Sequence, residues 1–272
     1  MIRRILVVGG ANGIGLAIAQ EMARRESTER VYIVDKAPLM EEYAHPKIQS
    51  FQFDLTSEDY SFFDIFGDID ALMITAGFGR LSLFKDVPEH YIMQSFNVNT
   101  IPVLRLVHKF YDRLEAQEDF YCGVMVSIAG FMSSPFFAVY GATKAALKIF
   151  IESVNVELSK ADTSNRILNI SPGSIKGTGF NAGKTDLKQL QGLVIDIVTH
   201  LEAKDDLFIP LYDEVYNTVL QRYHDDFRKE GEHSYEYKLN SERIMKKNTP
   251  PIQVRYNIKR FTSNVLHNLC AA

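Results

Sequence analysis

Three polar residues in the middle of the chain have the types and spacing of an acid/base apparatus. Tyr140 and Lys144 are four residues apart in Tyr-Gly-Ala-Thr-Lys, and Ser127 lies 13 positions before Tyr140. Residues 138–159 are predicted to be helical, and residues four apart share one face of a helix. A free phenol has a pKa near ~10, and an adjacent cation lowers it. We therefore expect Lys144 to bring the pKa of Tyr140 toward neutral pH for proton transfer, and Ser127 to hydrogen-bond the substrate oxygen.

The N-terminal segment carries a second motif, which makes a chance Tyr-x-x-x-Lys pair on an exposed helix the weaker interpretation. Residues 5–8 are typical of a buried strand and lead through a glycine-rich turn into a predicted helix over 16–23. Such a turn lets a pyrophosphate approach the backbone and the amide donors of the helix N-terminus. A second predicted strand, 31–34, ends at Asp35, 20 residues beyond Gly15, where a carboxylate would bind the adenosine ribose. This order predicts a dinucleotide-binding unit.

The remaining elements continue the alternation of strands and helices. Further strands are predicted over residues 48–53, 71–75, 123–127 and 167–170, and a helix is predicted over 103–114. Right-handed crossovers then give an α/β fold, a Rossmann-type doubly wound parallel sheet between two layers of helices. A chain of 272 residues fits one such domain. The motif residues follow strand ends, so we expect them to meet at the carboxyl edge of the sheet.

With these motifs in place, residues 2–178 resemble a classical short-chain dehydrogenase/reductase (SDR). The spacing Gly-x-x-x-Gly-x-Gly is the variant of that family, and its Asn-Asn-Ala-Gly strand end corresponds to Ile-Thr-Ala-Gly at 74–77. The resemblance implies hydride transfer between a nicotinamide and a secondary alcohol or ketone. It implies that Tyr140 moves the proton, that Lys144 lowers its pKa and holds the nicotinamide ribose, and that Ser127 polarises the carbonyl. Asn99 would position a water.

The resemblance also assigns a set of site residues. The implied catalytic residues are Asn99, Ser127, Tyr140 and Lys144. The implied coenzyme-binding residues are Gly9, Asn12, Gly13, Ile14, Gly15, Asp35, Lys36, Asp54, Leu55, Ala76, Gly77, Tyr140, Lys144, Pro172, Gly173 and Ile175. No metal site is expected, because the seven histidines show no close pairing.

Several positions depart from the family pattern. Val8 replaces a threonine whose hydroxyl commonly bonds across the glycine turn, and both asparagines before Ala76 are absent. Gly177 stands at the usual threonine position after Pro-Gly. Asn97 competes with Asn99 for the alignment, and Asn99 is favoured because the helix over 103–114 then falls in register. These changes affect coenzyme contacts and leave the Ser-Tyr-Lys set intact.

The choice of coenzyme depends on Asp35. A carboxylate at this position accepts hydrogen bonds from the ribose hydroxyls and repels the 2′-phosphate of NADP. Lys36 would tolerate NADP, whereas Asn12 offers no basic side chain. We expect NAD, with NADP possible.

The chain is less familiar after residue 178. Residues 178–250 are interpreted as a lid, within 180–191, and a helical substrate-side insert, with helices predicted over 187–201 and 213–220. The aromatic residues of the insert would shape a substrate pocket or a subunit contact, or pack as surface helices on the core. An edge strand is predicted over 252–256, after a break at 249–251.

The composition is that of an ordinary globular enzyme. The net charge of −4 and pI near 6.0 exclude a basic nucleic-acid surface, and no apolar run spans a bilayer. Two cysteines and no room for a signal peptide indicate a reducing, cytoplasmic location. The resemblance implies a homodimer or homotetramer through residues 98–118 and 140–160. Two other functions remain open: a coenzyme-binding regulator or scaffold without turnover, and another reaction on this fold, such as that of an epimerase, a dehydratase or an enoyl reductase.

Overall fold

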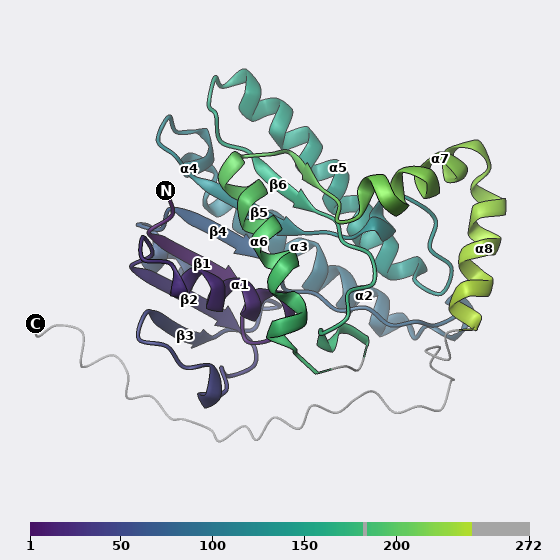
Figure 1. Cartoon of the computed structure of the whole chain (residues 1–272), viewed down its shortest axis with the longest axis horizontal. Helices are drawn as coiled ribbons and strands as arrows, with labels where there is room; N and C mark the ends of the chain where they lie inside the picture. The colour runs from purple at the N-terminus through teal and green to yellow at the C-terminus, as the bar shows by residue number, and fades with distance from the viewer. Residues whose placement is uncertain (182–183, 241–272) are drawn as a thin grey trace, which may run out of the picture.

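In the computed structural model, which describes residues 1–181 and 184–240, seven strands form one parallel sheet in the order β3-β2-β1-β4-β5-β6-β7 (Figure 1). The strands are β1 (Arg4–Val8), β2 (Arg30–Asp35), β3 (Ile48–Gln52), β4 (Ala71–Ile74), β5 (Tyr121–Met125), β6 (Ile167–Ile170) and β7 (Leu207–Phe208). The order runs outward from β1 in both directions, so the predicted doubly wound α/β sheet is confirmed. The break and edge strand predicted over 249–256 lie outside the described residues.

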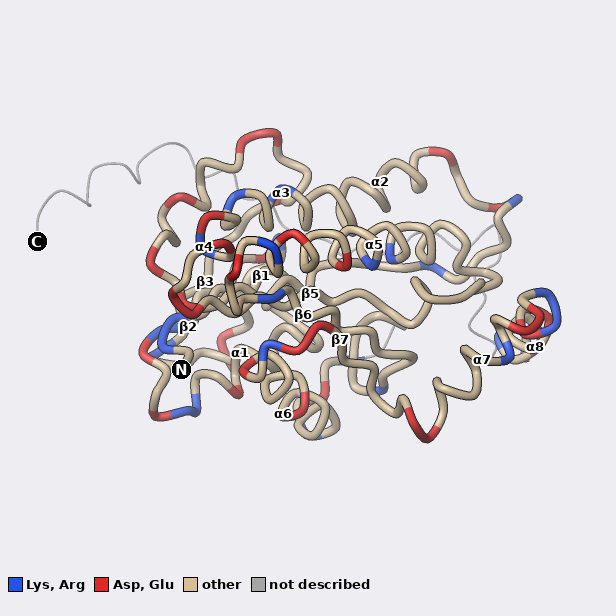
Figure 2. Tube along the Cα trace, turned by 90° about the horizontal axis from the view of Figure 1, so that it is seen from above, with Lys and Arg blue, Asp and Glu red and all other residues tan. Residues whose placement is uncertain are grey.

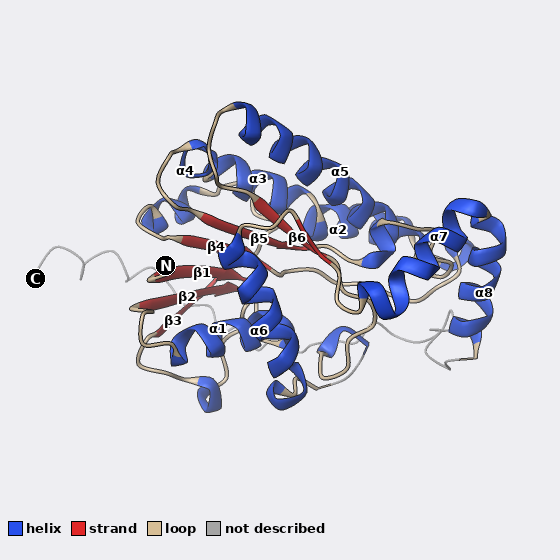
Figure 3. Ribbon diagram, turned by 45° about the horizontal axis from the view of Figure 1, so that its top comes forward, coloured by secondary structure: helices blue, strands red, loops and turns tan. Residues whose placement is uncertain are grey.

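Helices cover both faces of this sheet (Figure 3). They are α1 (Gly13–Arg24), α2 (Glu89–Asn99), α3 (Ile101–Lys109), α4 (Tyr111–Glu115), α5 (Ala138–Lys160), α6 (Leu187–Ala203), α7 (Asn217–Asp225) and α8 (Phe227–Leu239). Helices α1 and α6 pack on one face of the sheet, and α3, α4 and α5 on the other. Because the crossovers between parallel strands are right-handed, the direction in which the chain moves along the sheet decides the face on which each helix packs.

Alternate residues of each strand enter separate hydrophobic cores. In β1, Ile5 and Val7 pack with the α1 and α6 side, whereas Leu6 and Val8 pack with the α3 and α5 side. All four side chains are fully buried. Successive side chains of a strand point to opposite faces, so a run of apolar residues is what a strand buried on both faces requires.

The helix predicted over 103–114 is the end of a longer, interrupted helical segment. Helix α2 ends at Asn99, and α3 begins at Ile101 with Pro102 in its first turn. Proline has no amide to donate to the preceding turn, so one helix ends here and the next begins. The break leaves Asn99 at the end of α2, beside the carboxyl ends of the strands.

Helices α7 and α8 extend beyond the sheet on the side of its carboxyl edge (Figures 1 and 3). In α7 no residue is buried, and in α8 only Glu230 is. Arg222 of α7 donates to both carboxylate oxygens of Glu230, at 2.7 and 3.1 Å, and so joins the two helices. Figure 2 shows charged segments on these and other outer helices and loops, whereas the strands are mostly uncharged. No helix within the described ranges is long and apolar enough to cross a membrane.

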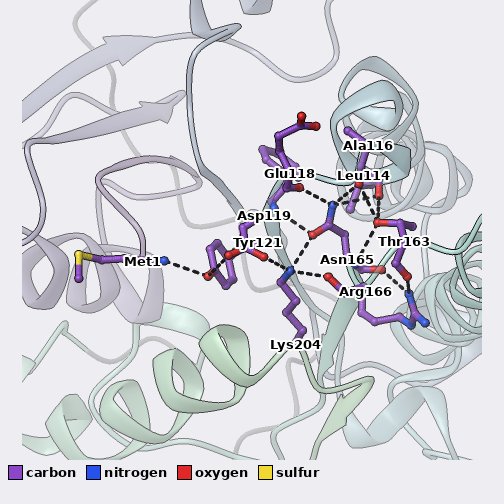
Figure 4. A network of polar contacts seen from close by, with 12 residues as sticks. Met1, Leu114, Ala116, Glu118, Asp119, Tyr121, Thr163, Asn165, Arg166 and Lys204 are labelled. Carbon is purple, nitrogen blue, oxygen red and sulfur yellow. Dashed lines mark hydrogen bonds and ion pairs between the residues drawn. The ribbon is translucent and has the colours of Figure 1, made fainter.

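A polar network braces the opposite, amino-terminal edge of the sheet (Figure 4). The fully buried Asn165, just before β6, accepts hydrogen bonds from Phe120 N at 3.0 Å and from Lys204 Nζ at 2.9 Å. Its Nδ2 lies within 2.9–3.3 Å of four backbone carbonyl oxygens of the segment from Arg113 to Glu118. One side chain thereby ties β5, β6 and the loop after α4 together.

Candidate active site

The four predicted catalytic residues meet at the carboxyl edge of the sheet. Ser127 follows β5, Asn99 ends α2, and Tyr140 and Lys144 occupy the first two turns of α5. All four are buried. The Ser127 side chain is near enough to Tyr140 to act on the pKa of its phenol, and Ser127 Oγ donates to Pro172 O, after β6, at 3.4 Å. The structure therefore brings together residues from three separate segments.

Asn99 links this group to the segment that follows β4. Its Oδ1 accepts from Phe78 N at 2.9 Å, and its Nδ2 donates to Phe78 O at 2.9 Å and to Thr143 Oγ1 at 3.2 Å. Gly77 lies between Asn99 and Lys144, since a Cβ atom there would be 3.3 Å from Asn99 Oδ1 and 3.5 Å from Lys144 Nζ. Of the two candidate asparagines, Asn99 is the one that makes these contacts.

The expected lowering of the pKa of Tyr140 by Lys144 is wrong for this structure. Burial raises the pKa of Tyr140 to about 12, and the nearby Ser127 hydroxyl opposes this only in part. Burial also lowers the pKa of Lys144 to about 7. Lys144 Nζ donates to Met125 O at 2.7 Å and lies 5.7 Å from the centroid of the Tyr140 ring. Loss of hydration disfavours the charged form of both groups and is the largest cause of both shifts.

The glycine-rich turn between β1 and α1 is closely packed against β4. A side chain at Gly9 would collide with the backbone of Ala76, and one at Gly15 with Gly9 O and Thr75. Gly13 has a φ of +58° and open space around it. The hydroxyl of Thr75 donates to Val8 O and Gly9 O at 3.1 and 3.0 Å. Thr75 thus braces the glycine-rich turn, a role that Val8 cannot fill because it has no hydroxyl.

The acidic residues after β2 and β3 lie beside this turn. Asp35 accepts from Ala11 N at 3.0 Å and from Ala37 N at 2.9 Å, which anchors its carboxylate at the end of β2. Lys36 forms an ion pair of 2.7 Å with Asp54. Partial burial alone would raise the pKa of Asp54, but hydrogen bonds from Lys36 and Thr56 hold it below its usual value.

The other predicted coenzyme residues border the same edge. Asn12 is exposed and its side chain does not cap α1, so the helix N-terminus keeps amide donors. Ile14 and Ile175 pack on the α1 and α6 core, and Leu55 packs on the opposite core. Pro172 O accepts from Ile128 N at 3.1 Å, which holds the segment after β6 against the Ser127 loop.

Three contacts in this region were not predicted from the sequence. Thr185 Oγ1 accepts from Gly13 N at 2.8 Å, at the start of α1. Phe180 lies against Tyr140, with 5.2 Å between ring centroids. The Tyr216 hydroxyl lies so close to Gly173 that any side chain there would collide with it. The partners in these contacts are 40 to 172 positions apart in the sequence, so no local periodicity signals them. The aromatic content of residues 207–237 is the sole hint.

Helix α8 packs on the loop that leads into α5. Tyr235 and Phe136 lie with ring centroids 4.6 Å apart, and Lys238 Nζ donates to Ser134 Oγ and Pro135 O at 2.7 and 3.0 Å. Tyr235 therefore contacts the loop that leads to Tyr140, and the aromatic residues of α7 and α8 are not in either hydrophobic core.

The donors and acceptors of this edge fit a dinucleotide. A closely packed glycine turn opens a helix that has no side-chain cap, and an anchored carboxylate stands at the end of the next strand. Within residues 1–181 and 184–240, no group of three or more His, Cys, Asp or Glu residues is arranged to hold a metal ion.

Comparisons with known proteins agree with this geometry. An uncharacterised oxidoreductase of Saccharomyces cerevisiae is 25% identical over 189 residues, 64% of this chain and 60% of the relative. The short-chain dehydrogenase fogD of Aspergillus ruber is 29% identical, over 62% of this chain and 61% of its own length. This chain thus spans about three fifths of the length of these two relatives.

Solved structures show the same fold at low identity. A short-chain dehydrogenase from Streptomyces avermitilis has a TM-score of 0.68 at 18% identity, over 88% of this chain and 99% of that one. An alcohol dehydrogenase from Thermococcus sibiricus, complexed with 5-hydroxy-NADP, has a TM-score of 0.65 at 19% identity, over 76% and 95%. Residues 3–189 match the family described as short chain dehydrogenase. With that match over more than half of its length, the chain belongs to the short-chain dehydrogenase family of oxidoreductases.

Proposed function

We propose that this protein is an NAD(H)-dependent oxidoreductase that interconverts a secondary alcohol and a ketone. The observation that carries the proposal is that Tyr140, Ser127 and Lys144 are buried together at the edge of the sheet where the glycine-rich turn begins α1. A bound nicotinamide would supply or accept the hydride there. The residues of the chain handle the proton and hold the reacting oxygen.

Tyr140 is suited to donate a proton to a carbonyl oxygen at neutral pH. With a pKa of about 12 it stays protonated in the buried site, and a carbonyl oxygen that gains negative charge would accept that proton. Ser127 Oγ, next to the same hydroxyl, would hydrogen-bond the same oxygen. Lys144, with a pKa of about 7, gains and loses protons near neutral pH and would return the proton to Tyr140.

Asn99 is proposed to act as a positioning residue. Both ends of its amide are bonded to Phe78 and Thr143, so it holds the segment after β4 against α5. That segment carries Gly77 and Gly79, which lie against Lys144 and Tyr140. Phe180 and Tyr216, from the segments interpreted as lid and insert, would form apolar walls of the substrate pocket.

The surroundings of Asp35 favour NAD over NADP. Its carboxylate, anchored by Ala11 N and Ala37 N, would accept from ribose hydroxyls and repel a 2′-phosphate. The ammonium of Lys36, the nearest basic side chain in the sequence, already pairs with Asp54.

The test follows the absorbance of NADH and NADPH with a panel of ketones and the corresponding alcohols, using wild type and Tyr140→Phe. We expect oxidation of NADH, preferred over NADPH and reduced at least ~10³-fold in the variant, since the proton donor is lost. Coenzyme binding, measured by NADH fluorescence, should be retained by Tyr140→Phe. Binding without turnover of any ketone by wild type would favour the coenzyme-binding regulator.

A further inference from the structure

Two buried polar atoms near Tyr140 have no hydrogen-bond partner. Among the described residues, four buried side-chain nitrogen or oxygen atoms lack one, and two of these are Arg80 Nε and Tyr91 Oη. The other two, Arg4 Nε and Thr28 Oγ1, belong to residues at the opposite edge of the sheet. Buried polar atoms are normally paired, so an orphan at a candidate active site indicates a partner from outside the chain.

Both residues border the substrate side of Tyr140. Arg80 follows Gly79, which lies so close to the Tyr140 and Phe180 rings that a side chain there would collide with them. The Tyr91 ring packs edge-on against Phe78, with centroids 5.5 Å apart, and Phe78 is held by Asn99. The phenol of Tyr91 is near enough to act electrostatically on Tyr140, and the guanidinium of Arg80 on Tyr91. The two orphan groups therefore belong to one corner of the site.

No other residue in the described part of the chain is hydrogen-bonded to Arg80 Nε or Tyr91 Oη. The Ser95 hydroxyl is near Tyr91, but it donates to the carbonyl oxygen of Tyr91 at 2.7 Å and leaves the phenol without a hydrogen bond of good geometry. No carboxylate among the described residues forms an ion pair with Arg80, although the residue is only half-buried. A guanidinium only donates, and a phenol can donate as well as accept, so a partner rich in acceptors would satisfy both groups. A negative charge on that partner would also balance the guanidinium.

We propose that Arg80 and Tyr91 bind a carboxylate of the substrate, so that the preferred substrates are keto acids and the matching hydroxy acids. One guanidinium balances one carboxylate charge, whereas a phosphate monoester would call for a second cation, and Lys144 is directed at Met125 O. The rings of Phe137 and Phe180, both packed on Tyr140, favour an apolar body between the carboxylate and the reacting oxygen. This inference rests on the proposed reaction at Tyr140.

The first test compares turnover of a keto acid with that of its ester. Benzoylacetate and ethyl benzoylacetate are supplied with NADH to wild type, Arg80→Gln, Arg80→Lys and the control Arg24→Gln, an exposed arginine of α1. We expect wild type to prefer the acid by about ten- to hundredfold in kcat/KM, the range of hydrogen bonds to charged groups. Arg80→Gln should lose that preference through KM and keep the ester rate, Arg80→Lys should retain part of it, and Arg24→Gln should match wild type.

A second test needs no turnover. Calorimetry with NADH present measures binding of 3-phenylpropanoate and of 3-phenylpropanamide, and only the carboxylate should bind in an Arg80-dependent way. Equal binding of acid and amide, or equal losses for acid and ester in Arg80→Gln, would overturn the inference. Reduction of ketones without a preference for acids would overturn the carboxylate inference and leave the proposed reaction at Tyr140 intact. Arg80-dependent carboxylate binding without NADH binding or turnover would instead contradict the reaction.

Discussion

At the scale of single residues, Lys144 is a charged group whose burial opposes folding. Because its pKa falls from 10.5 to about 7, the folded protein binds fewer protons than the unfolded chain between these pH values. Burying the ammonium therefore lowers the free energy of unfolding by its full amount below pH 7, and this loss of stability decreases as the pH rises toward 10.5. We expect Lys144→Met to raise the free energy of unfolding by about 1 to 3 kcal/mol at pH 6, since ~1.4 kcal/mol per pKa unit is offset in part by the lost bond to Met125 O.

Urea unfolding of Lys144→Met and wild type from pH 6 to 10 checks this, and the gap between them should shrink as the pH rises. Lys148→Met, one turn further along α5 and paired with Glu152 at the surface, is the matched control and should show no such trend. A Lys144→Met protein less stable than wild type at every pH would mean that the ammonium is stabilised by contacts stronger than its bond to Met125 O.

Thr185 is a second residue whose role can be tested alone. Its hydroxyl accepts from Gly13 N, an amide at the helix terminus proposed to bind the coenzyme pyrophosphate. Because a phosphate oxygen would compete for that amide, Thr185→Val should tighten NADH binding about two- to fivefold, as expected for the loss of one competing hydrogen bond. NADH fluorescence titration measures this, with Thr199→Val on the outside of α6 as control. Weaker binding by Thr185→Val would show that the hydroxyl assists the coenzyme.

At the scale of elements, the amino-terminal edge of the sheet depends on Asn165. Its side-chain amide is hydrogen-bonded to Phe120 N, to Lys204 Nζ and to the loop after α4, and so joins three segments at that edge. Asn165→Ala leaves these buried groups unpaired, at ~1–3 kcal/mol for an orphaned group, so we expect a loss of about 2 to 4 kcal/mol. Thermal and urea unfolding measure it, with the exposed Gln117→Ala of the same loop as control. Equal stability of the two variants would contradict this role.

The same scale shows which elements a sequence can predict. Strands β1, β2 and β6 agree with the prediction to within a residue or two, because most of their residues are apolar and buried. Strand β7 was missed: it has two residues, Leu207 is exposed, and its pairing with Asn169 spans 38 positions. The predicted helix over 213–220 is a π-helical turn, Tyr212–Tyr216, followed by α7, a distinction that periodicity cannot make.

In the site, spacing placed Tyr140 and Lys144 on one face of α5, but the direction of Lys144 toward Met125 O and the depth of burial decide their pKa values. Both depend on β5 and on the loops that cover α5, which are distant in sequence. The orphaned atoms of Arg80 and Tyr91 are likewise visible only in three dimensions, since an unpaired donor is defined by everything around it.

At the scale of the whole molecule, the outer face of α5 is apolar where a single copy of the chain would leave it in water. Ile149 and Val156, seven residues apart on that face, are 58% and 62% exposed, and Ile101 at the start of α3 is 45% exposed. These residues lie in the two helical segments through which pairing of subunits was predicted. Exposed apolar residues grouped on neighbouring helices are typical of an interface between copies related by twofold symmetry.

We therefore expect wild type to run as a dimer or tetramer in light scattering coupled to size-exclusion chromatography, and Ile149→Arg/Val156→Arg to run as a smaller species. Two arginines on this face would bring like charges together across a twofold axis, because each would meet residues of the same patch in the other copy. Ile195→Arg, which adds a charge to an exposed apolar position on α6, should leave the mass unchanged. A double variant of unchanged mass would place the subunit contact elsewhere. A monomeric wild type would contradict the predicted oligomer. Circular dichroism of the double variant separates dissociation from unfolding, since a dissociated protein keeps its helical signal.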